Sequence, residues 1–294
     1  MARGRRSILA AAVLWSLGGA FAKSLPLDGP SIAFYRSLFA GLILLPLVPR
    51  SRWVVRPAMV PLGLVFGAMT GLYIAAIKAT TAANAIFLQC TATFWTIPLS
   101  ALLLRERPDR RSVLGIGLAS FGIVAIVLYG YDGRPDEGRG IALGLASGIF
   151  YAGVVVGLRG FRDLDPVWLS AFNNLAGALA LGGMLAAAGS PPVVPTAEQA
   201  LALAGFGVLQ MAIPYILFAK GLRQIKAPEA SLLALIEPVL NPIWVVLATG
   251  EKPATATLIG GLFLLSGVAV RYWPFTADAG ETKEDDIEPG GQPP

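Results

Sequence analysis

The sequence predicts an all-α polytopic membrane protein, with ten transmembrane helices that form two inverted five-helix repeats around a central cavity. Three observations support this fold class. The chain contains apolar runs of membrane-spanning length, its basic residues gather in alternate loops, and its two halves share a spaced pattern of residues.

Long uncharged segments are the first observation. The chain has a mean hydropathy of +0.67 and 14% charged residues, against roughly 25% in a typical soluble domain. Asp, Glu, Lys and Arg are absent from residues 57–77, 79–104, 112–131, 140–158, 166–197 and 199–219. About 20 apolar residues cross a bilayer as a helix, so each segment is close to or above the required length.

Proline, glycine and charged residues divide the apolar sequence into ten predicted spans. These spans cover residues 7–23, 31–49, 58–77, 82–104, 111–130, 139–158, 166–188, 198–219, 228–248 and 254–272. The connections between them are short, which leaves no room for a soluble domain.

The distribution of Lys and Arg orients the spans. With a cytoplasmic N-terminus, the inner loops hold sixteen basic residues: Arg3, Arg5, Arg6, Arg50, Arg52, Arg56, Arg105, Arg107, Arg110, Arg111, Arg159, Arg162, Lys220, Arg223, Lys226 and Arg271. The outer loops hold five: Lys23, Lys78, Arg134, Arg139 and Lys252. Because basic loops face the cytoplasm, we expect both termini there. The pI near 9.5 therefore reflects topology and predicts no nucleic-acid partner.

The two ends of the chain need separate interpretation. An apolar stretch follows MARGRR and ends at residues 20–22, a pattern shared with signal peptides, and cleavage there would leave nine spans. The internal repeat needs the first span, so we interpret it as retained. Residues 273–294 are acidic and rich in glycine and proline, which predicts a disordered tail.

The two halves of the chain match at a nearly constant spacing. At a shift of 145 residues, Lys78 corresponds to Arg223, Glu106 to Glu251, Pro108 to Pro253, Gly115 to Gly260 and Gly122 to Gly267. At shifts of 136 and 137, Trp15 corresponds to Tyr151, Asp28 to Asp165 and Arg36 to Asn173. Five spans is an odd number, so the predicted repeats at 7–130 and 139–272 have opposite orientations. Inverted repeats are typical of secondary transporters, whose substrate site lies where the repeats meet.

The order of several motifs resembles a known family. The first span runs from Trp15 to Lys23, Arg36 lies early in the second, and Glu237-Pro238 precedes Gly250-Glu251 in the ninth. With the count of ten spans, this order resembles the EamA family of the drug/metabolite transporter superfamily over residues 7–272. Within that family, the overall sequence is most similar to bacterial aromatic amino-acid exporters. The resemblance implies export across the bacterial inner (plasma) membrane of amino acids, aromatic ones in particular, and of planar drug-like cations.

Glu237 is the first candidate site residue. A carboxylate near the centre of a span costs roughly 2.5–3.5 kcal/mol to insert, so it faces the bundle interior or a wet cavity. Pro238 and Pro242 remove backbone donors around it, which predicts an interrupted helix with free carbonyls, and Asn241 shares its face. We interpret this segment as a wall of the substrate path where Glu237 meets a cationic group or a proton. The structural alternative is a carboxyl that pins two helices together.

Other polar residues inside the spans are further candidates. Gln89 and Trp95 lie on the fourth span, the repeat mate of the ninth, and we expect them near Glu237. Asn173 lies midway along the seventh span and Gln210 beside Pro214 in the eighth.

Basic and aromatic residues complete the candidate set. Arg36 or Lys78 would meet a substrate carboxylate, although Arg36 has the alternative of extending to the outer interface. Trp15, Tyr73, Tyr151 and Tyr215 lie away from span ends, where interfacial aromatic residues gather. They predict an aromatic cavity for a flat, amphipathic or weakly cationic solute, with helix packing as the alternative.

The residue types present exclude several functions. The chain has no histidine and a single cysteine, Cys90, so we expect no Ser-His-Asp catalysis, no metal and no other cofactor. GxxxxGK[ST] is absent, which excludes direct ATP use through a P-loop. One deep carboxylate does not suit a membrane enzyme. The sequence predicts a monomeric secondary transporter for small amphipathic metabolites that works by alternating access. The alternatives are a passive channel, an integral membrane enzyme, and an exchanger of sugar phosphates or nucleotide sugars, which would need several deep cations.

Overall fold

The structure is a computed structural model that describes residues 2–106, 110–129 and 136–252, and residues 255, 259, 260, 262, 263, 266, 267 and 270. Every regular element in these residues is a helix. In chain order they are α1 (Ala2–Trp15), α2 (Gly18–Ser24), α3 (Gly29–Leu44), η1 (Leu45–Leu47), η2 (Arg50–Arg52), α4 (Met59–Ala79), α5 (Ala82–Gln89), α6 (Ala92–Leu104), α7 (Arg110–Tyr129), α8 (Glu137–Gly160), α9 (Pro166–Ala187), α10 (Ala197–Gly207), η3 (Val208–Ala212), α11 (Ile213–Leu222), α12 (Ala227–Ala234) and α13 (Ile236–Thr249).

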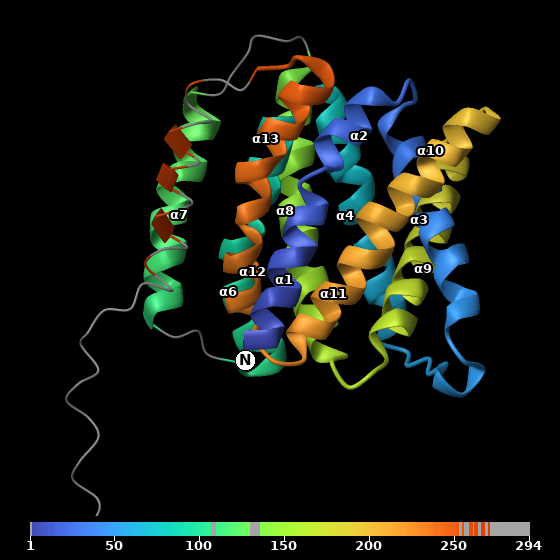
Figure 1. Ribbon diagram of the computed structural model, residues 1–294, viewed down its shortest axis with the longest axis horizontal. Coiled ribbons are helices and arrows are strands. Elements are labelled where there is room, and N and C mark those ends of the chain that lie inside the picture. Colours follow the sequence, from blue (N-terminus) through green and yellow to red (C-terminus); the bar gives the residue numbers. More distant parts are fainter. Residues whose placement is uncertain are drawn as a thin grey trace, which may run out of the picture.

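Eight stretches of the described chain are long and apolar enough to cross a membrane. They are Ala2–Ser24, Gly29–Leu47, Met59–Ala79, Ala82–Leu104, Gly138–Gly160, Pro166–Ala187, Ala197–Leu222 and Ala227–Thr249. These match predicted spans one to four and six to nine, and α7 covers the predicted fifth. Most of the predicted tenth span, 254–272, and the predicted tail, 273–294, lie outside the described residues. The chain is thus a multi-pass membrane protein, with its helices side by side (Figure 1).

The fourth and ninth spans are each divided into two helices. The break between α5 and α6 lies at Cys90 and Thr91, and the break between α12 and α13 lies at Leu235. The sequence predicts an interruption of the ninth span at its prolines, but the break precedes both of them. Pro238 lies in the first turn of α13, where a backbone donor has no helical partner, and Pro242 lies inside that helix.

The helices of the fourth span and those of the ninth span have corresponding ends when the two spans are compared at a shift of 145 residues. α5 and α12 each contain eight residues, and their ends correspond at this shift. α6 and α13 end at corresponding residues too. Each is followed by a residue in the left-handed region, Arg105 with φ of 55° and Gly250 with φ of 73°.

Aspartate side chains begin the second and seventh spans. Asp28 accepts a hydrogen bond from the Ser31 amide at 2.8 Å, and Asp165 accepts from the amides of Val167 and Trp168 at 2.9 and 3.2 Å. A cap of this type stabilises a helix by about 1 kcal/mol. The two caps correspond at a shift of 137 residues.

α4 and α9 approach closely because glycine faces glycine. A Cβ built on Gly67 would lie 2.6 Å from the carbonyl oxygen of Gly177, closer than real Cβ atoms come. Small residues at helix contacts let membrane helices pack backbone to backbone. This contact sets the separation of α9 from α4, and α4 contributes Met69 and Tyr73 to the site described below.

Replacing Gly67 by alanine is expected to destabilise the protein by about 1–3 kcal/mol, because the added methyl group meets backbone that cannot move aside. A lower midpoint of thermal unfolding in detergent would show this. Gly183→Ala is the matched control, since a Cβ on this α9 residue meets no atom within 4 Å among the described residues. Equal midpoints for the two variants would contradict the prediction.

Candidate functional site

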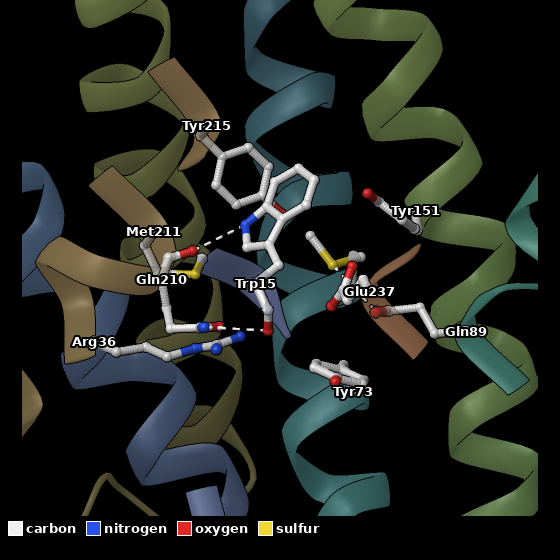
Figure 2. Close-up of a pocket in the computed structure, with 10 residues that line it drawn as sticks. Trp15, Arg36, Tyr73, Gln89, Tyr151, Gln210, Met211, Tyr215 and Glu237 are labelled. Carbon is white, nitrogen blue, oxygen red and sulfur yellow. Dashed lines mark hydrogen bonds between the residues drawn. The ribbon is translucent and has the colours of Figure 1, made fainter. Parts of the chain in front are cut away.

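A pocket lies inside the bundle, between the halves of the chain. The empty space among its lining residues is about 320 Å³, which includes space open to solvent. It is lined by Trp15, Arg36, Met69, Tyr73, Gln89, Tyr151, Gln210, Met211, Tyr215 and Glu237 (Figure 2). Eight of these residues are among the candidates that the sequence predicts.

Irregular helix geometry places four of the lining side chains. Trp15 ends α1, Gln89 ends α5, and Glu237 is the second residue of α13. Gln210 lies in η3, a single π-helical turn between α10 and α11. π-turns and interrupted helices occur often at functional sites because they redirect side chains and free backbone groups.

Trp15 and Gln210 hold each other in place. The indole Nε1 of Trp15 donates to the Gln210 carbonyl at 3.0 Å, and Gln210 Nε2 donates to the Trp15 carbonyl at 3.1 Å (Figure 2). Gln210 Nε2 also donates to the Leu14 carbonyl. The amide thus binds two carbonyls at the break after α1, and it fixes the indole ring against the pocket.

Aromatic rings form one wall of the pocket. The ring centroid of Trp15 lies 4.9 Å from that of Tyr215 and 6.1 Å from that of Tyr151, both edge-on. The hydroxyls of Tyr73 and Tyr151 are buried and have no hydrogen-bond partner among the described residues. Buried hydroxyls usually have partners, so a bound molecule can supply them here.

The pocket is lined by one basic and one acidic side chain. Arg36 is 3% exposed, donates to the Thr70 hydroxyl, and places its guanidinium carbon 5.2 Å from the Phe206 ring centroid. Its Nε has no hydrogen-bond partner in the described chain. Glu237 is 7% exposed, and none of the described residues forms a hydrogen bond or ion pair with its carboxylate. The two side chains enter from different sides (Figure 2), so a basic and an acidic group both face the contents of the pocket.

Four predicted site residues do not line the pocket. Trp95 is 47% exposed on the outer surface of α6, and Lys78 donates to the Leu25 carbonyl at 2.7 Å near one end of the bundle. Asn173 is buried between helices. Asn241 donates to the Ser16 carbonyl at 3.0 Å, so it satisfies backbone freed by the break after α1. Sequence alone does not place these side chains, because a span that is apolar on all sides does not show which face is inward.

Two lining residues were not predicted. Met69 and Met211 are buried at the pocket, and the Gln89 amide lies 3.6 Å from the Met69 sulfur. Methionine in an apolar run carries no distinguishing signal, although its flexible thioether suits surfaces that adapt to several solutes.

Comparison with known proteins identifies the family. A model of the EamA-like transporter family matches residues 4–128 and again residues 138–273. An uncharacterized transporter of Archaeoglobus fulgidus is 33% identical over 276 residues, which cover 92% of this chain and 97% of that protein. One from Clostridium kluyveri is 24% identical over 292 residues, which cover 92% and 94%.

A protein of known crystal structure shares the fold. It superposes with a TM-score of 0.72 at 21% sequence identity, over 92% of this chain and 96% of that one. The helical architecture, the family matches and the full-length relatives agree. The chain is therefore a membrane transporter that belongs to the EamA-like transporter family of the drug/metabolite transporter superfamily.

Proposed function

We propose that the protein exports small amphipathic metabolites by alternating access, with amino acids, including aromatic ones, as the main substrates. Planar drug-like cations are further candidate substrates. We further propose that it acts as a monomer in a bacterial inner membrane with both termini in the cytoplasm, as the distribution of arginine predicts.

The observation that carries the substrate proposal is the pairing of Arg36 and Glu237 within one aromatic pocket. An amino acid carries a carboxylate and an ammonium group, which would meet these two side chains. Its aromatic ring would pack against Trp15 and Tyr215. A buried charge without a partner is costly, so a zwitterion that satisfies both charges gains binding energy from the pocket.

Alternating access is supported by signs of an inverted repeat. The family model matches two consecutive segments, and the divided spans correspond at one shift. A Cβ on Gly115 would lie 2.6 Å from the Gly267 carbonyl oxygen, and one on Gly122 would lie 2.5 Å from that of Gly260. In the repeat, Gly115 corresponds to Gly260 and Gly122 to Gly267, so the contacts are crossed, as in a two-fold contact.

A phosphate-bearing substrate is the second possibility within the superfamily. A phosphate site would gather several Arg or Lys side chains. Arg36 is the one basic side chain among the residues that line the pocket, so the geometry favours a substrate with a single carboxylate.

Purified protein in proteoliposomes is expected to take up radiolabelled phenylalanine and tryptophan above empty liposomes. An imposed pH gradient that changes the rate would identify coupling to protons, with Glu237 as the candidate carrier. A labelled sugar phosphate serves as the comparison substrate. Uptake of the sugar phosphate with no uptake of either amino acid would contradict the proposal.

A further inference from the structure

We propose that two matched ionic locks close the ends of the substrate path, and that transport requires them to open one at a time. The inner lock joins Glu106 to Arg159 and to the amide of Ala227. The outer lock joins Glu251 to Lys23 and to the amide of Ala82. This inference rests on the proposed transport cycle and assigns the residues that gate it.

The inner lock is a nearly buried ion pair. Arg159 at the end of α8 places Nε and Nη2 each 2.8 Å from Glu106 Oε1, and Arg162 adds an Nη1 at 3.5 Å. The side chains of Arg159 and Glu106 are 12% and 11% exposed. The other carboxylate oxygen accepts from the Ala227 amide at 3.4 Å, so Glu106 also caps the start of α12. Arg159 in addition donates to the Leu222 carbonyl.

The outer lock repeats this arrangement at the other end of the bundle. Lys23 at the end of α2 places Nζ 3.2 Å from Glu251 Oε2, and the two side chains are 15% and 19% exposed. Glu251 Oε1 accepts from the Ala82 amide at 3.1 Å and so caps the start of α5. Lys23 also donates to the Thr80 carbonyl at 2.9 Å.

The members of the two locks correspond in sequence. Glu106 and Glu251 are 145 residues apart, as are Ala82 and Ala227, while Lys23 and Arg159 are 136 apart. A second pair of contacts beside the locks follows the same rule. Lys78 donates to the Leu25 carbonyl, and Arg223 Nε donates to the Arg162 carbonyl, both at 2.7 Å. Equivalent residues thus make equivalent contacts at both ends.

Each lock ties the two halves of the chain together at one end. Glu106 follows the last helix of the fourth span and holds the first residue of the divided ninth span. Glu251 follows the ninth span and holds the first residue of the divided fourth span. The halves cannot separate at either end without breaking the carboxylate contacts of that end, and the pocket lies between the two ends. In this structure both locks are closed.

The two locks differ in strength. A guanidinium makes several directed hydrogen bonds to a carboxylate and is weakly hydrated, whereas an ammonium is a compact and strongly hydrated charge. In the described part of the chain, Arg159 and Arg162 lie near the inner carboxylate and Lys23 lies near the outer one. We therefore expect the outer end to open more readily when the pocket is empty.

The locks can be tested without any substrate, by following a reporter cysteine in the pocket. In the full chain with Cys90→Ala, the Met69→Cys variant is labelled by a membrane-impermeant maleimide in right-side-out and inverted membrane vesicles. Glu106→Gln is expected to raise the labelling rate from one face, and Glu251→Gln from the opposite face, each on the order of tenfold, as for loss of a charge-assisted hydrogen bond. The Met69→Cys variant with both locks intact should be labelled faster from the face that Glu251→Gln opens than from the other face.

Other variants separate gating from a structural role. Asp163→Asn breaks the exposed ion pair between Asp163 and Arg56, which lies at the same end as the inner lock, and should leave both labelling rates unchanged. The hydrogen bond from Arg56 lowers the pKa of Asp163, so this ion pair is intact at neutral pH. Lys23→Met and Arg159→Met test each lock through its other partner, which provides a second readout if a glutamine variant fails to fold. Because Lys23 and Glu251 form one contact, adding Lys23→Met to Glu251→Gln should raise the labelling rate little further.

Labelling that rises equally from both faces, or in neither lock variant, would overturn the gating proposal. That result is independent of the substrate, because no solute is present. Failure of amino-acid uptake with correct sidedness of labelling would reject the proposed substrate and retain the locks.

Discussion

Glu237→Gln is expected to lower phenylalanine transport in proteoliposomes by about 100-fold. Truncating one member of a buried charge pair costs several kcal/mol, much of it from the charge left unpaired. Here that charge is the substrate ammonium, which would enter a pocket that no longer contains an anion. Glutamine keeps the size of the side chain, so the loss would come from charge rather than from packing.

Glu198→Gln is the matched control for this variant. Glu198 is an exposed carboxylate in the first turn of α10 and is not among the residues that line the pocket, so its neutralisation should leave transport unchanged. Both proteins should elute alike from size exclusion, which excludes a folding defect. Transport by Glu237→Gln within twofold of wild type would reject the assigned role of this carboxylate, and a structural carboxyl would then explain its burial.

Arg36→Met is expected to abolish selectivity for the substrate carboxylate. Phenylalanine transport should fall by about 100-fold, since the substrate carboxylate would lose its charge partner, while transport of phenethylamine, which lacks the carboxylate, should fall little. Arg36→Lys should be intermediate. Lysine keeps the charge but lacks the fixed fork of donors of arginine. In the wild-type protein one of these donors binds the Thr70 hydroxyl.

The ratio of the two transport rates is the decisive measurement for Arg36. A purely structural arginine would lower both rates together, because a distorted pocket does not distinguish the two solutes. Equal loss for phenylalanine and phenethylamine would therefore contradict the role proposed for Arg36 and leave Glu237 as the sole charged contact.

The spans were largely predictable from sequence, and the breaks within them were not. Several charge-free runs of membrane length in one chain are typical of membrane helices, and eight of the predicted spans recur as apolar helices. The break at Leu235 lies in a run of alanine and leucine, residues that favour helix. The start of α12 involves a distant contact as well, because the Ala227 amide donates to Glu106. No local pattern reports such a contact.

Sequence best indicates the position of those site residues whose side chains are costly to place in lipid. The burial of Glu237 follows from the cost of placing a carboxylate in lipid. Arg36 had two possible outcomes in sequence, and contact with Thr70 and Phe206 shows that it lies inside the bundle. Trp95 carries no such cost in either environment, so sequence does not determine which way it points.

The left-handed residues after α6 and α13 show how the two halves are alike. Alignment pairs Arg105 with Gly250, two residues that differ in size, charge and backbone freedom. Their φ angles of 55° and 73° nevertheless belong to one conformation. The backbone conformation at these two positions is similar, although the side chains are not. A comparison of residue types therefore understates the conformational similarity of these two positions, just as 21% identity understates a superposition with a TM-score of 0.72.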